Sequence, residues 1–165
     1  MNNLNLFNTY RYYKICWDSR FENGHNKKSN ACHYGYTDVS KFYKDNNEYD
    51  KEKNNTNIEL IKCINRNKDD KLNILDAGCG YGGSMIYLCK HFVNSLVFGI
   101  TLTDTQIEMS SNNIKKNYLE NGYVVKGNFD KLNYDMKLEI KYDIIYFIES
   151  ICHSSCKKKT IENSL

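Results

Sequence analysis

Proline is absent from this sequence of 165 residues. Its absence, together with abundant asparagine, indicates a coding bias towards A and T and carries no chemical information. No apolar stretch approaches the roughly 20 residues that a membrane-spanning helix requires, so the sequence predicts a soluble protein with no membrane span. Hydrophobic residues make up 41% and charged residues 26%, a balance that predicts one globular domain with a core of its own.

A strong charge of either sign is also missing. The formal net charge is +3, and the short basic run at residues 157–159 lies near the end of the chain. A run of this kind is typical of a solvated terminus. We therefore expect no nucleic-acid partner.

The seven cysteines lack the paired spacing of a zinc site. Their number is odd, no signal peptide is present, and several fall on expected core faces, so we predict a reducing compartment, the cytoplasm. Cys152 and Cys156, with Cys32 and His33, suggest a mixed zinc site, but the sequence contains no C-x-x-C pair. We expect no metal.

Four glycines within six residues mark the stretch around which the chain is organised. An apolar run at residues 72–75 predicts a buried strand that ends at Asp76, and a helical pattern of apolar residues covers 85–92. The glycines between them are Gly78, Gly80, Gly82 and Gly83. This strand, glycine turn and helix bring a backbone close to a polar ligand, because glycine has no Cβ and permits positive φ. A tight connection without a ligand is the alternative.

Three further apolar runs predict strands of a parallel α/β sheet. They span residues 95–100, 123–126 and 142–148. The helix after the first of them is expected to reach about Leu119 and to end at Asn121-Gly122. That strand ends at Thr101, where nicotinamide-binding folds place an acid for the ribose hydroxyls. Asp104 comes three residues later, which argues against a dinucleotide.

Two of these stretches resemble one known family. Residues 75–84, LDAGCGYGGS, are similar to the first motif of class I S-adenosylmethionine-dependent methyltransferases. Residues 99–106, GITLTDTQ, resemble the second motif of one branch, which comprises cyclopropane fatty acid synthases and tocopherol, sterol and geranyl diphosphate methyltransferases. The resemblance covers roughly residues 30–153. It implies a Rossmann-like, doubly wound parallel sheet of strand order 3-2-1-4.

The resemblance also implies which residues hold the cofactor, S-adenosylmethionine. They are Tyr34, Asp76, Gly78, Cys79, Gly80, Gly82, Thr101, Gln106, Asn128 and Phe129. The glycine loop would hold the amino-acid tail, and Tyr34 would close over it. Thr101 and Gln106 would contact the ribose, while Asn128 and Phe129 would face the adenine.

Several of these roles have structural alternatives. Gln106 fits a capping box with Thr103, in which each satisfies the other's backbone N–H group. Asn128 stands where many members have an acid, and Asp130 is either its substitute or a turn former. The aromatic turn around Tyr34 could simply pack on the domain.

Glu149 and His153 follow the last predicted strand, beside the first strand, where open α/β sheets bind ligands. In the resembled branch a similar Glu-Ser-x-x-His segment stands here, and its acid contacts either the substrate or a catalytic anion. We therefore expect Glu149 to be the catalytic base, with His153 as second choice. A first-turn acid favoured by a helix dipole and an ordinary surface histidine are the alternatives.

The sequence predicts two parts. Residues 1–57 form an N-terminal helical and loop segment over the cofactor, with an exposed connector at 40–55, and residues 58–165 form the cofactor-binding domain. Twelve residues follow His153, so the last strands of the family are expected to be missing. We predict methyl transfer to a small-molecule, lipid or prenyl acceptor. A truncated, inactive or regulatory cofactor-binding protein is the alternative, and self-association or a second chain could complete the sheet.

Overall fold

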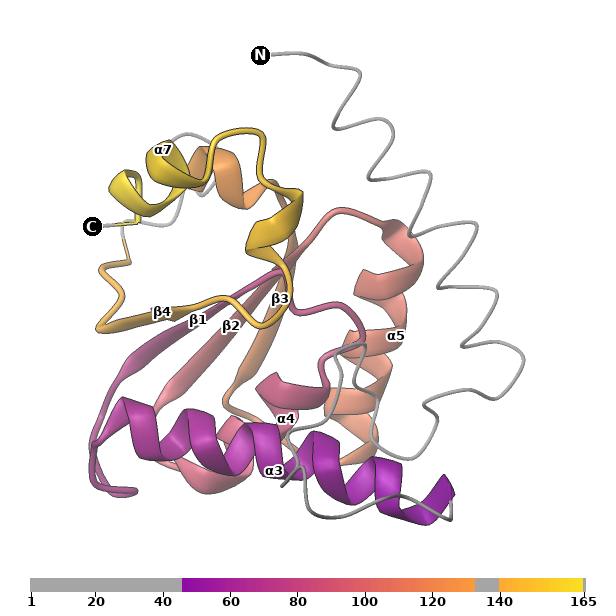
Figure 1. Ribbon diagram of the computed structural model, residues 1–165. Helices are drawn as coiled ribbons and strands as arrows, with labels where there is room; N and C mark the ends of the chain where they lie inside the picture. The colour runs from indigo at the N-terminus through magenta and orange to yellow at the C-terminus, as the bar shows by residue number, and fades with distance from the viewer. Residues whose placement is uncertain (1–45, 133–139, 165) are drawn as a thin grey trace.

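The computed structural model describes residues 46–132 and 140–164. Within these ranges the strands form one four-stranded parallel sheet of order β3-β2-β1-β4, as Figure 1 shows. The strands are β1 (Asn73–Ala77), β2 (Leu96–Thr101), β3 (Gly122–Lys126) and β4 (Ile144–Tyr146). The predicted fold class and strand order are confirmed.

The two central strands are buried on both faces because helices and loops cover each side of the sheet. Residues 74–77 of β1 and 97–101 of β2 are all buried, which explains their continuous apolar character. β4 is shorter than the predicted strand at 142–148, since it pairs only with residues 74–76 of β1 in the described part of the chain. Before β4 the chain stays hydrogen-bonded to β1, since the N–H of Asp143 donates to the Asn73 carbonyl at 2.9 Å.

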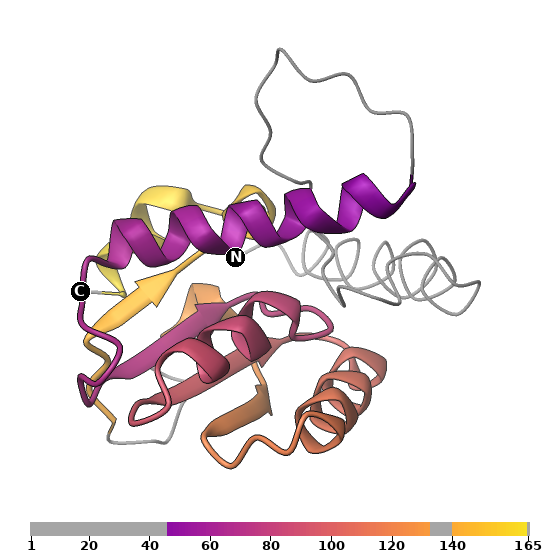
Figure 2. The same cartoon turned by 90° about the horizontal axis from the view of Figure 1, so that it is seen from below.

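Three helices lie side by side on one face of the sheet. They are α3 (Asn46–Ile64), α4 (Gly83–His91) and α5 (Asp104–Lys116), and Figure 2 shows them from below. α4 contacts β2, and α5 contacts β3. The core on this face includes Ile74, Met85, Leu88, Phe92, Val97 and Ile114. No helix in the described ranges is long and apolar enough to cross a membrane.

The opposite face carries a second, smaller core. Its buried members are Leu75, Ala77, Phe98, Ile100 and Leu132. Short elements lie near the carboxyl ends of the strands: η2 (Phe129–Lys131), η3 (Ile151–His153) and α7 (Lys157–Glu162). α7 packs against η2 (Figure 1), so the last described helix is tied to the segment that follows β3.

α3 is much longer than predicted. The sequence indicated a short helix at 58–64 after an exposed connector at 40–55, but residues 46–55 are helical as well. Lys53 and Asn57 are 1% and 3% exposed, and Leu60 and Ile61 continue the same face one turn later. The buried polar residues hid this face from a search for apolar periodicity. The expected boundary at residue 57 therefore falls inside one continuous helix.

α5 ends earlier than predicted and by a different device. The N–H of Leu119 donates to the Ile114 carbonyl at 3.2 Å, and the N–H of Tyr118 donates to the Lys115 carbonyl at 3.0 Å. This is a Schellman motif, which requires a left-handed residue after the helix. Tyr118 takes that conformation with φ of 55°. The predicted terminator, Gly122, instead begins β3.

We expect Tyr118→Gly to stabilise the protein. The left-handed conformation costs a residue with a Cβ about 1–2 kcal/mol, and glycine avoids most of that cost. The Tyr118 side chain is 93% exposed, so its removal loses little packing. The free energy of unfolding, measured with urea, should rise by about 1 kcal/mol.

Tyr123→Gly is the matched control, because Tyr123 lies in β3 and stacks on Phe98 with ring centroids 5.5 Å apart. This second substitution should destabilise the protein. Equal effects at the two positions would contradict the interpretation of Tyr118.

Candidate functional site

The loop between β1 and α4 has a left-handed backbone at three glycines. φ is 102° at Gly78, 54° at Gly80 and 85° at Gly82, values that favour glycine. The N–H groups of Gly78 and Cys79 both donate to the Ile100 carbonyl at 3.0 Å. These two donors are therefore used within the fold. Any anion held by this loop must use N–H groups farther along it.

α5 supports the far end of the same loop. Asn113 Nδ2 donates to the Tyr81 carbonyl at 3.2 Å. A Cβ added to Gly82 would lie 3.2 Å from the Cβ of Ser110, which is tighter than an ordinary contact. The loop is thus held by β2 at its start and by α5 at its end, and its shape is fixed before any ligand arrives.

Ser150 joins the first strand to the segment after β4. Its hydroxyl donates to the Ala77 carbonyl at 2.5 Å, and the residue is buried. A Cβ on Gly78 would overlap the Cβ of Ser150 and would lie 2.9 Å from its Oγ and 3.6 Å from the Phe129 ring. The ends of β1, β3 and β4 therefore converge on Gly78, at the point where the strand order reverses.

Asp76 lies beneath the glycine loop and is only 3% exposed. Burial raises the pKa of its carboxyl group to about 7, while the Tyr146 hydroxyl opposes that rise. The two residues are register partners on neighbouring strands. Their side chains interact without meeting normal hydrogen-bond geometry. Burial first, and then the charge of Asp76, raises the pKa of Tyr146.

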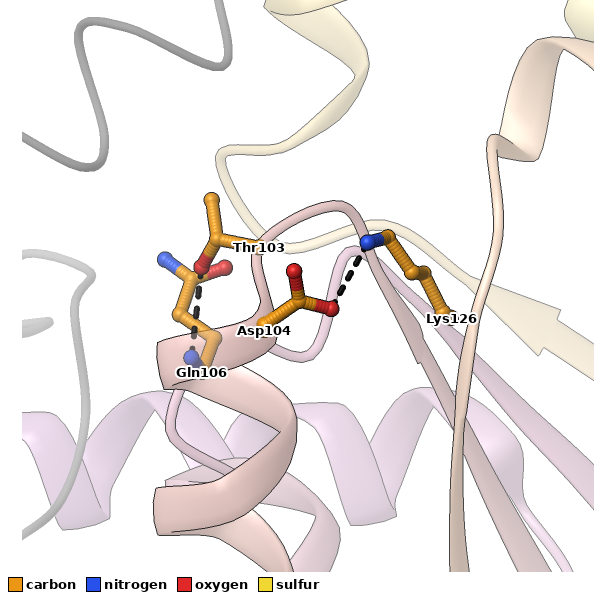
Figure 3. Close-up of polar contacts among 4 residues, drawn as sticks. All are labelled: Thr103, Asp104, Gln106 and Lys126. Atoms are coloured by element: carbon orange, nitrogen blue, oxygen red, sulfur yellow. Dashed lines mark hydrogen bonds and ion pairs between the residues drawn. The ribbon is translucent and has the colours of Figure 1, made fainter.

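Thr101 and Gln106 meet at the end of β2. The Thr101 hydroxyl donates to Gln106 Oε1 at 2.5 Å in a buried contact. The backbone N–H of Gln106 donates to Thr103 Oγ1 at 3.2 Å, which caps α5 (Figure 3). Half of the predicted capping box is therefore present, but the Gln106 side chain turns to Thr101 instead. Its Nε2 is buried without a hydrogen-bond partner in the described part of the chain.

An ion pair lies on the solvent-exposed side of the start of α5. Lys126 Nζ lies 2.6 Å from Asp104 Oδ1, which joins the end of β3 to the first turn of α5 (Figure 3). Both side chains are more than half exposed, so the pair contributes little to stability. Asp104 therefore faces solvent and Lys126, consistent with the argument against an acid that holds a dinucleotide.

Asn128 and Phe129 follow β3 at the same edge of the sheet. The Asn128 side chain accepts the N–H of Asp130 at 2.9 Å and so caps η2, which leaves one lone pair of Oδ1 for a ligand. Phe129 packs edge-on against Phe147, with ring centroids 5.7 Å apart. Phe129 thus stands between Gly78 and Phe147.

Asp130 does not take the place that the sequence suggested for it as a substitute for Asn128. Its Oδ2 accepts the N–H and hydroxyl of Ser155 at 3.1 and 2.9 Å, and its Oδ1 accepts the Thr160 hydroxyl at 2.6 Å. Burial alone would raise its pKa, but hydrogen bonds from Thr160, Ser154 and Ser155 leave the pKa below the ordinary value. The carboxylate binds the C-terminal segment.

Glu149 lies just before η3, and His153 is the last residue of η3, both after β4. Glu149 is exposed and has a left-handed backbone with φ of 50°, which is uncommon outside glycine. His153 is partly buried, and this burial lowers its pKa. Neither residue begins an α-helix, so the helix-dipole alternative for Glu149 is wrong.

Sequence reasoning missed two residues of the site, Ser150 and Tyr146. Both belong to stretches that were singled out, but nothing local distinguishes a serine that bonds β1 from one that faces water. Alternation along 142–148 could have placed Tyr146 on the face of Asp76, once the two strands were known to be neighbours. Tyr34 lies outside the described residues.

Taken together, the described residues form a polar, glycine-lined site at the carboxyl edge of a parallel sheet. A profile of the family described as "Methyltransferase domain" matches residues 68–165. The chain belongs to this family. The class I S-adenosylmethionine-dependent methyltransferase predicted from the two motifs is confirmed, and so is the cofactor of that class.

Individual relatives agree with this assignment. The chain is 40% identical to 24-methylenesterol C-methyltransferase 3 of Arabidopsis thaliana over 98 residues, which are 59% of this chain and 25% of that enzyme. Its fold is similar to that of a geranyl diphosphate methyltransferase, with a TM-score of 0.63, 18% identity, and coverage of 78% of this chain and 51% of that one. The [4+2]-cyclase SpnF gives a TM-score of 0.70 at 16% identity, over 94% of this chain and 53% of that one.

The chain thus spans about a quarter of the length of the plant methyltransferase and about half of the two solved chains. Its five described cysteines are free thiols. Within residues 46–132 and 140–164, no group of three histidine, cysteine or acidic side chains is arranged to hold a metal ion.

Gly78→Ala should destabilise the protein by about 3 kcal/mol. The added Cβ meets Ser150, and alanine at φ of 102° is strained in addition. The energetic coupling between residues 78 and 150 is measured by urea unfolding of three variants: Gly78→Ala, Ser150→Gly and the double variant. The double variant should be more stable than the sum of the single effects predicts, because Ser150→Gly removes the overlap. Strict additivity would show that the two residues do not meet.

The pKa of Asp76 predicts a pH-dependent stability. Because folding raises this pKa from 3.8 to about 7, the folded state prefers the neutral acid. The contribution of neutral Asp76 to the free energy of unfolding is fully present below pH 4. It falls as the pH rises towards 7 and does not change further above pH 7. At about 1.4 kcal/mol per pH unit, the loss is about 4 kcal/mol at most.

Asp76→Asn mimics the neutral acid and should lose this dependence. Urea unfolding of both proteins between pH 4.5 and 7.5 gives the difference in unfolding free energy, in which other titrating groups cancel. That difference should grow with pH in favour of the Asp76→Asn variant. A difference independent of pH would mean that Asp76 titrates normally.

Proposed function

We propose that this chain binds S-adenosylmethionine at the carboxyl edge of its sheet and transfers the methyl group to a lipid or prenyl acceptor. One observation carries the proposal: the positive-φ glycine loop lies beside a buried Thr101–Gln106 pair whose Nε2 has no described partner. An amide donor held in this way is costly unless a ligand accepts its hydrogen bond.

The cofactor fits these groups in chemical character. Gln106 Nε2 offers a donor for a ribose hydroxyl oxygen, since Thr101 already occupies Oε1 and Thr103 caps the helix. Gly78, Cys79, Gly80 and Gly82, beneath which Asp76 lies, would line the amino-acid tail, while its carboxylate would meet N–H groups farther along the loop than Cys79. A Cβ at Gly78 or Gly82 would meet Ser150 or Ser110, so glycine at these two positions lets the loop keep this shape.

The adenine would lie against Phe129, with the remaining lone pair of Asn128 Oδ1 facing its amino group. This role is supported by the position of Phe129 next to Gly78, on the side where β3 ends. Tyr34, outside the described residues, is proposed to close over the methionine end.

When bound, the cofactor would supply an electrophilic methyl group on its sulfonium; the acceptor would attack this methyl carbon in line while the methyl–sulfur bond breaks and the thioether leaves. The residues of the chain then orient the acceptor and remove a proton. Glu149 is proposed as the base, because its left-handed backbone holds an exposed carboxylate three residues after the end of β4. His153, whose lowered pKa keeps the imidazole neutral near pH 7, is the second candidate for base.

The acceptor class rests on the relatives. One is a sterol C-methyltransferase and another a geranyl diphosphate methyltransferase, so we propose an apolar acceptor with an alkene carbon or a hydroxyl group. A cytoplasmic location and self-association stay predictions from the sequence.

Isothermal titration with S-adenosylmethionine tests cofactor binding. We expect saturable binding, and about tenfold weaker binding for Gln106→Leu, which removes one hydrogen bond to a buried donor. Glu108→Gln, an exposed change on the same helix, is the control and should bind like the natural chain. Binding of a nicotinamide cofactor instead, or equal affinity of Gln106→Leu, would refute the proposed site.

Transfer of a radiolabelled methyl group to sterols and to geranyl diphosphate tests the reaction. Glu149→Gln should abolish most turnover and leave cofactor affinity unchanged, because the proposal places Glu149 against the acceptor and not the cofactor. Cofactor binding without turnover on any acceptor would favour the alternative function, a binding or regulatory protein.

A further inference from the structure

Asp130 connects the two sides of the proposed site. It belongs to η2, directly after Phe129, and its carboxylate accepts hydrogen bonds from Ser155 and Thr160. Its own carbonyl accepts Asn163 Nδ2 at 3.2 Å. Every one of these donors lies in the segment after η3. One buried carboxylate therefore holds a segment whose nearest hydrogen-bonding residue is 25 positions away.

The same contacts extend to the residue after His153. Thr160 Oγ1 lies 2.7 Å from Ser154 Oγ, and the N–H of Cys156 donates to that Ser154 oxygen at 3.1 Å. Asp130, Ser154, Ser155 and Thr160 form what we call the Asp130 network. Thr160 is 1% exposed and Asp130 8%, so water does not replace these bonds easily.

The network is joined to His153 through the neighbouring residue Ser154. The N–H of His153 donates to the Ser150 carbonyl at 3.0 Å, and Ser150 is bonded to β1. η3 is thus fixed to the sheet at its start and to the Asp130 network at its end. A three-residue 3₁₀ turn has little stability of its own, so attachments of this kind help to hold it in place.

We propose that Asp130 is a positioning residue that fixes the His153 segment against η2, so that the acceptor side of the site is set relative to Phe129. This proposal rests on the proposed function, which assigns the acceptor to the His153 side and the cofactor adenine to the Phe129 side. The attachment of the His153 segment to Asp130 can be measured in the protein without cofactor.

The NMR titration of His153 is the test, with Asp130→Ala as the variant. Hydrogen–deuterium exchange of residues 151–164 is followed in parallel. The C2–H signal of His153 is assigned from the spectrum of His153→Gln, because the sequence has four histidines. In the natural chain its pKa should lie below the usual value of about 6.5, since the ring is partly buried.

In Asp130→Ala the pKa should rise to about 6.5, and exchange protection of residues 151–164 should be lost while that of β1 and β2 remains. The sign of the change in the His153 pKa separates the two possible effects of the substitution. Loss of a negative charge alone would lower the histidine pKa, whereas release of the segment raises it.

Two variants complete the series. Thr160→Val removes one donor at nearly constant volume and should give a smaller rise, which keeps the test valid if Asp130→Ala fails to fold. Asp130→Asn should keep the exchange protection and should not raise the His153 pKa, because the Thr160 hydroxyl can rotate to accept from its amide.

Glu162→Gln, an equal charge change on exposed α7, should have no effect. An unchanged or lowered His153 pKa in both Asp130→Ala and Thr160→Val would overturn the proposal. Failure of S-adenosylmethionine to bind would overturn the proposed function and leave these readouts unaffected.

Discussion

The close approach of Gly78 to Ser150 is the constraint on which the rest of the site depends. At this point β1 passes into the glycine loop while the chain leaving β4 crosses beside it, and the Ser150 hydroxyl bonds the last residue of β1. Only a residue without a Cβ allows both the positive φ and the contact. Because Ile100 and Asn113 also hold the loop, contacts within the fold set its shape without a ligand.

Around this point the carboxyl ends of the strands contribute side chains of different character. β2 and α5 supply the polar Thr101–Gln106 pair, η2 supplies an aromatic ring, and the segment after β4 supplies Glu149 and His153. A parallel sheet brings these groups together because all its strands end at one edge. Similarity to the cyclase SpnF shows that the fold by itself does not choose the reaction. The choice lies with the side chains.

Two buried carboxyl groups in this small unit illustrate how environment sets charge. Asp76 is buried, and among the described residues only Tyr146 favours its ionised form, so its pKa rises. Asp130 accepts hydrogen bonds from several donors and stays ionised to lower pH. The two groups therefore affect stability with opposite signs of pH dependence, although burial disfavours the charge of both.

The sequence by itself determined the strands, the glycine loop and the start of α5, because apolar runs, glycine spacing and a capping threonine act over a few residues. It did not reveal the full length of α3, whose buried face includes Lys53 and Asn57, or the end of α5 at Tyr118. Only the tertiary structure decided that Gln106 turns to Thr101 and that Asp130 serves the C-terminal segment. Ser150 and Ala77 are 73 residues apart and Asp130 and Thr160 are 30 apart. Such pairs are set by how the strands come together, which no local pattern records.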